Sequence, residues 1–154
     1  MRDAFYAGAL PPEASSLLEE AMSHYTNTEK AESLLRKALA AYPDALPLYF
    51  SMYKFLFYKG RLQEAEQAAR SALETAAEQG GFPNSYETLT PEIADWTRYD
   101  SPQHFYLFSL KALAFIRLRL GDSDGCERML SKLRELDSAD TIGGSVIGAL
   151  AAGL

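Results

Sequence analysis

The side chains best suited to acid–base or nucleophilic chemistry are few and scattered. The chain has two histidines, His24 and His104, and one cysteine, Cys126. Catalysis needs several such groups held at close range, and these three residues fall in separate predicted elements. No Cys and His spacing matches a zinc site, and the glycine pairs lack the lysine and strand context of a phosphate-binding loop. The sequence therefore predicts no catalytic residue, metal site or cofactor, and a protein that is not an enzyme.

The composition is that of an ordinary folded domain with an acidic balance. The 154 residues are 47% hydrophobic and 23% charged, with a formal net charge of −6, which suits one domain with its own core. An acidic chain is repelled by nucleic acid and by anionic membrane surfaces. No apolar run approaches the roughly 18 residues of a membrane span, and a signal-peptide pattern is lacking. We therefore expect a cytoplasmic protein, which the single cysteine also fits.

Proline and glycine divide the chain into segments whose apolar residues recur at helical spacing. The second segment begins at Thr26, which together with Glu29 forms the pattern of a capping box. No stretch alternates as a strand does. The sequence predicts an all-α fold of about six helices and a short C-terminal helix, beginning near residues 12, 26, 47, 61, 102, 122 and 141.

Apolar positions repeat with a period of 34 residues. Two adjacent units, 12–45 and 46–79, and a third, 107–140, align when Gly60 and Gly121 are taken as turns inside helix pairs. The aligned residues are Leu18, Met22, Ala31, Leu35, Ala38 and Pro43 in the first unit, Tyr49, Met52, Leu56, Gly60, Ala65, Ala69 and Ala72 in the second, and Leu110, Leu113, Ala114, Gly121, Leu130 and Leu133 in the third.

These helix–turn–helix units resemble the tetratricopeptide repeat family. The resemblance departs at Cys126, where the family usually has alanine, and at Ser138, where a proline often stands. It implies a single domain in which helical hairpins form a right-handed superhelix. An insertion, 80–106, and a C-terminal capping or oligomerisation helix, 141–154, would lie outside the repeats.

The resemblance also implies that the first helix of each pair lines a concave groove that binds a partner. The residues that it places in this groove are Phe50, Lys54, Phe57, Phe108, Lys111 and Phe115. Because the set is mostly aromatic, we expect the groove to accept an apolar helix or extended segment. The lysine, arginine and asparagine set with which one subclass grips a C-terminal carboxylate is not matched. The alternative is that the insertion or the tail covers these rings.

The insertion is too aromatic for a flexible linker. Its Trp96 and Tyr99 are candidate partner contacts if it forms an ordered flap beside the groove. Alternatively, the insertion packs down and seals the second repeat.

The tail combines small residues with an apolar one. Gly144 and Gly148 have a spacing that permits close contact between helices, with Ile147 beside them. These residues either cap the third repeat or form an isologous homodimer.

The leading hypothesis is a bacterial scaffold or adaptor, or a chaperone-like protein, that binds an unidentified protein or peptide. One alternative is a self-assembling structural subunit that dimerises through its C-terminal helix. Another is a small-ligand sensor with a pocket between the groove and the insertion.

Overall fold

The computed structural model describes residues 10–153, which form seven α-helices, one short 3₁₀ helix and no strand. The helices are α1 (Pro12–Ser23), α2 (Thr28–Ala41), α3 (Leu46–Tyr58), α4 (Leu62–Gly80), α5 (Pro102–Arg119), α6 (Ser123–Leu136) and α7 (Gly144–Ala152), with the 3₁₀ helix at Tyr86–Thr88. The expected all-α fold is confirmed. None of the helices in this range is long and apolar enough to cross a membrane.

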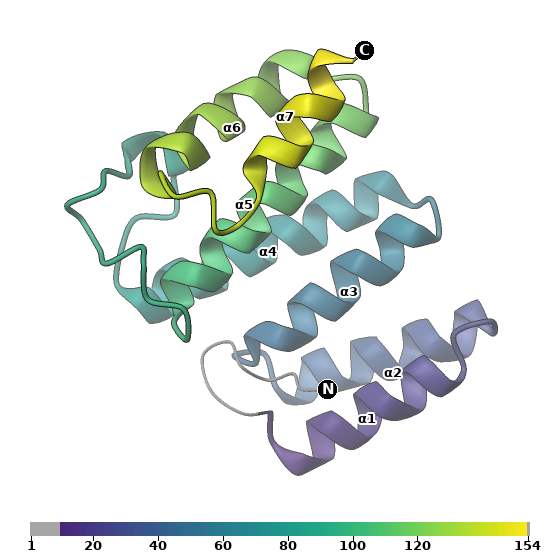
Figure 1. Ribbon diagram of the computed structural model, residues 1–154. Helices are drawn as coiled ribbons and strands as arrows, with labels where there is room; N and C mark the ends of the chain where they lie inside the picture. The colour runs from purple at the N-terminus through teal and green to yellow at the C-terminus, as the bar shows by residue number, and fades with distance from the viewer. Residues whose placement is uncertain (1–9, 154) are drawn as a thin grey trace.

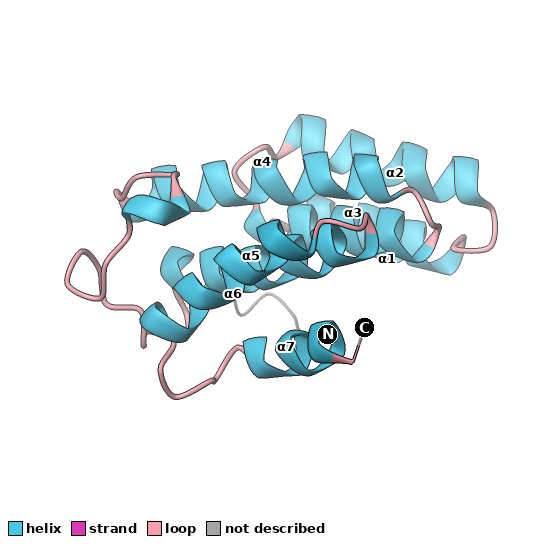
Figure 2. Ribbon diagram, turned by 90° about the horizontal axis from the view of Figure 1, so that it is seen from above, coloured by secondary structure: helices cyan, strands magenta, loops and turns pink. Residues whose placement is uncertain are grey.

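Each helix packs against the next one along the chain, and α5 also contacts α3 and α7. The helices α1, α3 and α5 run in one direction, and α2, α4 and α6 run in the opposite direction (Figure 1). Seen from above, α2 and α4 lie on one side of the molecule and α7 lies on the other (Figure 2). This arrangement makes α5 the most central helix.

The same turn closes the second and the third helix pair. Gly60 and Gly121 have φ angles of +79° and +91°, a backbone conformation that glycine adopts without steric cost. The N–H of the following residue donates to the carbonyl five residues back, from Arg61 to Leu56 and from Asp122 to Arg117. These hydrogen bonds satisfy backbone carbonyls that otherwise have no partner at the end of a helix. The predicted turn positions are therefore confirmed.

The start of α2 differs from the prediction. Asn27, and not Thr26, is the N-cap, and its side-chain oxygen accepts a hydrogen bond from the backbone N–H of Lys30 at 3.2 Å. The reason is distance along the chain, because a cap reaches the N–H two or three residues ahead and α2 begins one residue later than the capping box requires. Ser101 and Asp122 cap α5 and α6 in the same way.

Small side chains and ion pairs hold neighbouring helix pairs together. Ala31, Ala65 and Ala69 are fully buried, which lets helices approach closely. Arg61 donates to Glu32 of α2 at 2.6 Å, and Arg117 of α5 donates to Glu66 of α4 at 2.9 Å. Each of these two arginines therefore links its helix pair to the preceding one.

Candidate protein-binding cleft

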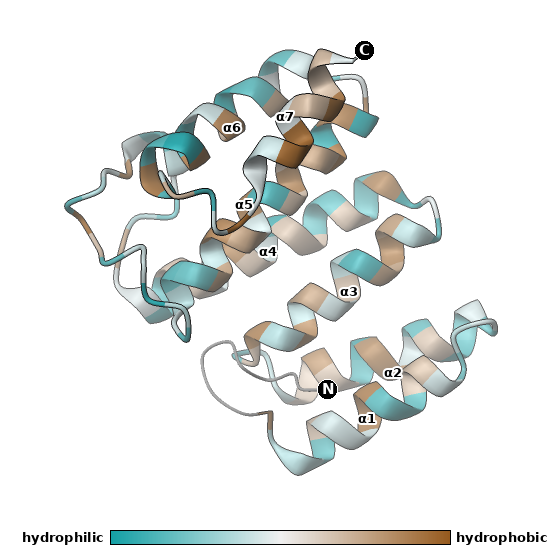
Figure 3. Ribbon diagram, viewed as in Figure 1, coloured by the Kyte–Doolittle hydropathy of each residue, from teal (hydrophilic) through white to brown (hydrophobic). Residues whose placement is uncertain are grey.

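A cleft of about 220 Å³ lies between α3 and α5. We call it the front cleft, and it is lined by Phe50, Tyr53, Lys54, Phe57, Tyr58, Phe108, Lys111, Ala112, Phe115 and Ile116. All six residues that the sequence predicts for the groove are among them. The lining atoms are mostly apolar, in keeping with the apolar bands that α3 and α5 show in Figure 3.

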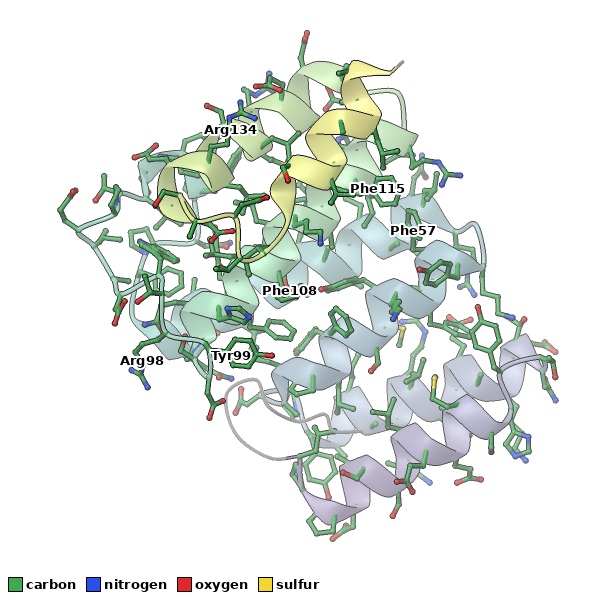
Figure 4. The ribbon with its side chains drawn as sticks, viewed as in Figure 1. Phe57, Arg98, Tyr99, Phe108, Phe115 and Arg134 are labelled. Carbon is green, nitrogen blue, oxygen red and sulfur yellow. The ribbon has the colours of Figure 1, made fainter. Side chains whose placement is uncertain are left out.

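Two pairs of phenylalanine rings form the floor of the front cleft. The ring centroids of Phe57 and Phe115 are 5.1 Å apart, and those of Phe50 and Phe108 are 6.2 Å apart in an edge-to-face arrangement. All four rings are half-buried. Figure 4 shows Phe57 and Phe115 close together and Phe108 farther back along α5. Seven residues separate the two pairs on each helix, which corresponds to about 10 Å along the cleft.

Three cations stand beside these rings. The Lys54 Nζ lies 5.5 Å from the Phe50 centroid, the Lys111 Nζ 5.6 Å from that of Phe108, and the Arg119 guanidinium 5.5 Å from that of Phe57. The Lys111 Nζ also donates to the carbonyl of Ile142 at 2.9 Å. Within residues 10–153, Lys54 and Arg119 form no hydrogen bond or ion pair. The front cleft is therefore aromatic with a positive rim.

The insertion packs down onto the core. Trp96 is only 5% exposed, its ring lies 5.0 Å from that of Phe82, and its Nε1 donates to the carbonyl of Thr90 at 2.9 Å. The side chain of Trp96 is therefore not exposed as a partner contact would be, because its ring packs against those of Phe82 and Tyr106. Tyr99 is 59% exposed, and its ring lies 4.5 Å from that of His104.

The small residues of the tail pack against α6 of the same chain. A side chain added at Gly144 would meet Leu133 at 3.5 Å, and one added at Gly148 would meet Leu130 at 3.9 Å. Ile147 is 5% exposed. Gly144 and Gly148, which were predicted to contact a second subunit, thus lie against α6, and Ile147 is buried within the chain. The large apolar side chains that α7 exposes are those of Val146 and Leu150.

The residues with potential chemistry are dispersed. His104 is buried, and desolvation lowers its pKa while the charge of Asp137 opposes that shift. Cys126 is buried on the inner face of α6, and burial raises the pKa of its thiol. No group of three His, Cys, Asp or Glu residues that could hold a metal occurs in the described part of the chain.

A second cleft, of about 500 Å³, lies on the opposite face of α5. This rear cleft is lined by Arg70, Leu73, Asn84, Ser85, Tyr86, Glu87, Tyr106, Leu113, Arg117, Asp122, Gly125, Arg128 and Met129. Arg117 donates to both Glu66 and Asp122, and Arg70 donates to Glu66. Sequence reasoning missed this cleft, because it forms only where the insertion folds back beside α4, α5 and α6.

The comparisons with known proteins add one relative. The chain is 27% identical over 155 residues to an uncharacterized 19.8 kDa protein in the nifW 5' region of Azotobacter chroococcum mcd 1. The alignment covers 93% of this chain and 80% of that protein. No family model and no solved structure matches the chain.

Proposed function

We propose that the protein is a tetratricopeptide-like interaction module that binds an apolar segment of another protein in the front cleft. The observation that carries this proposal is the convergence of two phenylalanine pairs from α3 and α5 in one cleft. Half-buried aromatic rings that line a groove between helices are typical of sites that accept an amphipathic helix or extended segment. A role as a cytoplasmic scaffold, adaptor or chaperone-like protein would use such a site, and the similarity to an Azotobacter protein favours a bacterial origin.

The repeat interpretation has its own support. Three helix pairs follow one another with the same alternation of direction, and the second and third close with the same glycine turn. The aligned alanines and leucines of the units are buried, except Leu18, which is half-buried. Stacked pairs of this kind are the building unit of helical repeat proteins.

The experiment that tests the proposal is photo-crosslinking from the front cleft. Tyr58 lines the cleft and is 64% exposed, so p-benzoylphenylalanine in its place disturbs the core little. We expect discrete adducts with a second protein when cells that naturally make the chain are irradiated. The control carries the same group at Lys37, an exposed residue of α2. The same adducts from both positions, or none from position 58, would refute the proposal.

One observation favours self-assembly as a second function. Val146 and Leu150 are 58% and 48% exposed on the outer face of α7, and burial of such a face in a homodimer would remove apolar surface from water. A dimer in sedimentation equilibrium that dissociates in the double variant Val146→Ser and Leu150→Ser would establish this alternative. A strict monomer at high concentration would rule it out.

A further inference from the structure

We infer that the segment bound in the front cleft is acidic, with carboxylates on both sides of an apolar residue that sits on Phe57 and Phe115. This inference rests on the proposed function and names the chemistry of the partner. Its basis is the charge of the two helices that form the cleft and the positions of their free cations. Among residues 10–153, the lining of the cleft includes no acidic side chain.

Charge is unevenly divided along the chain. The whole chain carries 15 basic and 21 acidic residues, a difference of −6. The helices α3 and α5 contain four basic residues, Lys54, Lys111, Arg117 and Arg119, and no acidic one. The remainder therefore has 11 basic and 21 acidic residues, a difference of −10. A positive surface in an acidic protein attracts negative groups selectively and repels positive ones.

The cations on the two faces of α5 differ in whether they form ion pairs. On the rear face, Arg117 is held by carboxylates, Glu66 at 2.9 Å and Asp122 at 2.9 Å. On the front face, Arg119 is exposed and has no carboxylate within the described residues. Lys54 on α3 is likewise exposed and has no such partner. These two cations can therefore accept a partner's carboxylates without breaking an existing ion pair.

The positions of the two cations define a pattern for the partner. Lys54 precedes Phe57 by three residues, and Arg119 follows Phe115 by four, so each lies about one helical turn, roughly 5 Å along the axis, from the ring pair. The ring pair therefore has a cation on either side of it. A helical segment with an apolar residue on the rings and acidic residues three or four positions before and after it would meet both cations. Because the pattern is symmetrical, either direction of the segment satisfies it.

The direct test uses three synthetic helical peptides with the same central apolar residue. The residues three or four positions before and after it are glutamate in the first peptide, glutamine in the second and lysine in the third. The affinity of each for the full-length chain is measured by fluorescence anisotropy at low and at physiological salt. We expect the glutamate peptide to bind about 10-fold more tightly than the lysine peptide, because exposed ion pairs contribute about 2- to 5-fold each. Salt should shrink this difference, since it screens exposed charges.

Variants assign the effect to the two cations. In the double variant Lys54→Glu and Arg119→Glu, we expect the preference to reverse in favour of the lysine peptide. The milder pair Lys54→Gln and Arg119→Gln should abolish the preference, and circular dichroism checks that both proteins are folded. Lys37→Glu reverses a single charge on α2, away from the cleft, and should leave the preference intact.

The remaining outcomes separate the inference from the proposed function. If all three peptides bind equally and Phe57→Ala weakens each of them, the acidic partner is overturned while an apolar binding site stands. If none binds, both the inference and the proposed function fail. A dimer of the chain itself that is lost in Phe57→Ala would identify a second copy as the occupant and overturn the inference.

Discussion

The two clefts on opposite faces of α5 differ in what their charges do. In the rear cleft, Arg117 and Arg70 share Glu66, and Arg117 also holds the Asp122 that caps α6. In the front cleft, Lys54 and Arg119 stand beside aromatic rings and have no carboxylate within the described residues. Charges that hold helix pairs together are therefore on one side, and charges free for another molecule are on the other. This contrast predicts that rear substitutions affect folding and that front substitutions affect binding.

The largest effect is expected where the two clefts share a helix. Leu110 is fully buried in α5, and Leu110→Ala should lower the free energy of unfolding by about 3 kcal/mol, because it removes buried methyl groups and leaves a cavity. Urea unfolding measures this change. The matched control is Leu150→Ala on α7, which is 48% exposed and should change stability by about 0.5 kcal/mol or less. Equal losses for the two variants would contradict the central position of α5.

The rear cleft should respond next. Glu66→Gln removes the carboxylate that pairs with Arg70 and Arg117, and we expect a loss of about 1–2 kcal/mol, because hydrogen bonds to charged groups stabilise more than neutral ones. Thermal unfolding at low and high salt measures it. Glu78→Gln, an exposed position on the same helix, is the control. A Glu66 variant as stable as this control would show that the rear charges do not hold α4 to α5.

Acid should weaken the ion pair between Arg61 and Glu32, which links the first two helix pairs. Hydrogen bonds from Arg61 and Arg36 lower the pKa of Glu32 from 4.5 to about 2. A carboxylate whose pKa is depressed in the folded state stabilises the fold above its unfolded value, and this contribution is lost as the pH falls. We therefore expect stability to decrease from about pH 5 to about pH 2. The decrease should be shallower in Glu32→Gln, and parallel profiles would contradict the role of this pair.

The smallest effect on stability is expected at the front rim. Lys54→Ala and Arg119→Ala should each change the free energy of unfolding by no more than about 0.5 kcal/mol, because neither side chain forms an ion pair in the part of the chain that the structure describes. Chemical denaturation provides the measurement. A loss of more than about 1 kcal/mol for either would assign these cations a structural role and remove the contrast between the clefts.

The sequence was a good guide to the helices and to the front cleft. Prolines and glycines that end helices act locally, and the 3.6-residue period identifies which faces point inward. The repeat alignment brought Phe57 and Phe115 together although 58 positions separate them in the sequence, and the structure places their rings in contact.

Predictions of contacts were weaker for segments that could pack either on the chain's own core or on another molecule. Trp96 could have faced a partner or the core, and only the fold of the insertion against Phe82 and Tyr106 decides this. Gly144 and Gly148 permit close contact with any helix, so their spacing does not distinguish α6 from a second chain. The rear cleft joins residues of three helices and a loop, and no local pattern marks such a combination.

The connection between α4 and α5 is the covalent link between helices α1–α4 and helices α5–α7. Arg98 is exposed in this connection, and cleavage after it would separate α1–α4 from α5–α7. The surface between these pieces includes the contact of α4 with α5, the most extensive between any two helices described here. The severed pieces should therefore stay associated and refold together from separate solutions. A gene split at this point would still yield an assembled protein, and residues inserted at this exposed position would carry little penalty.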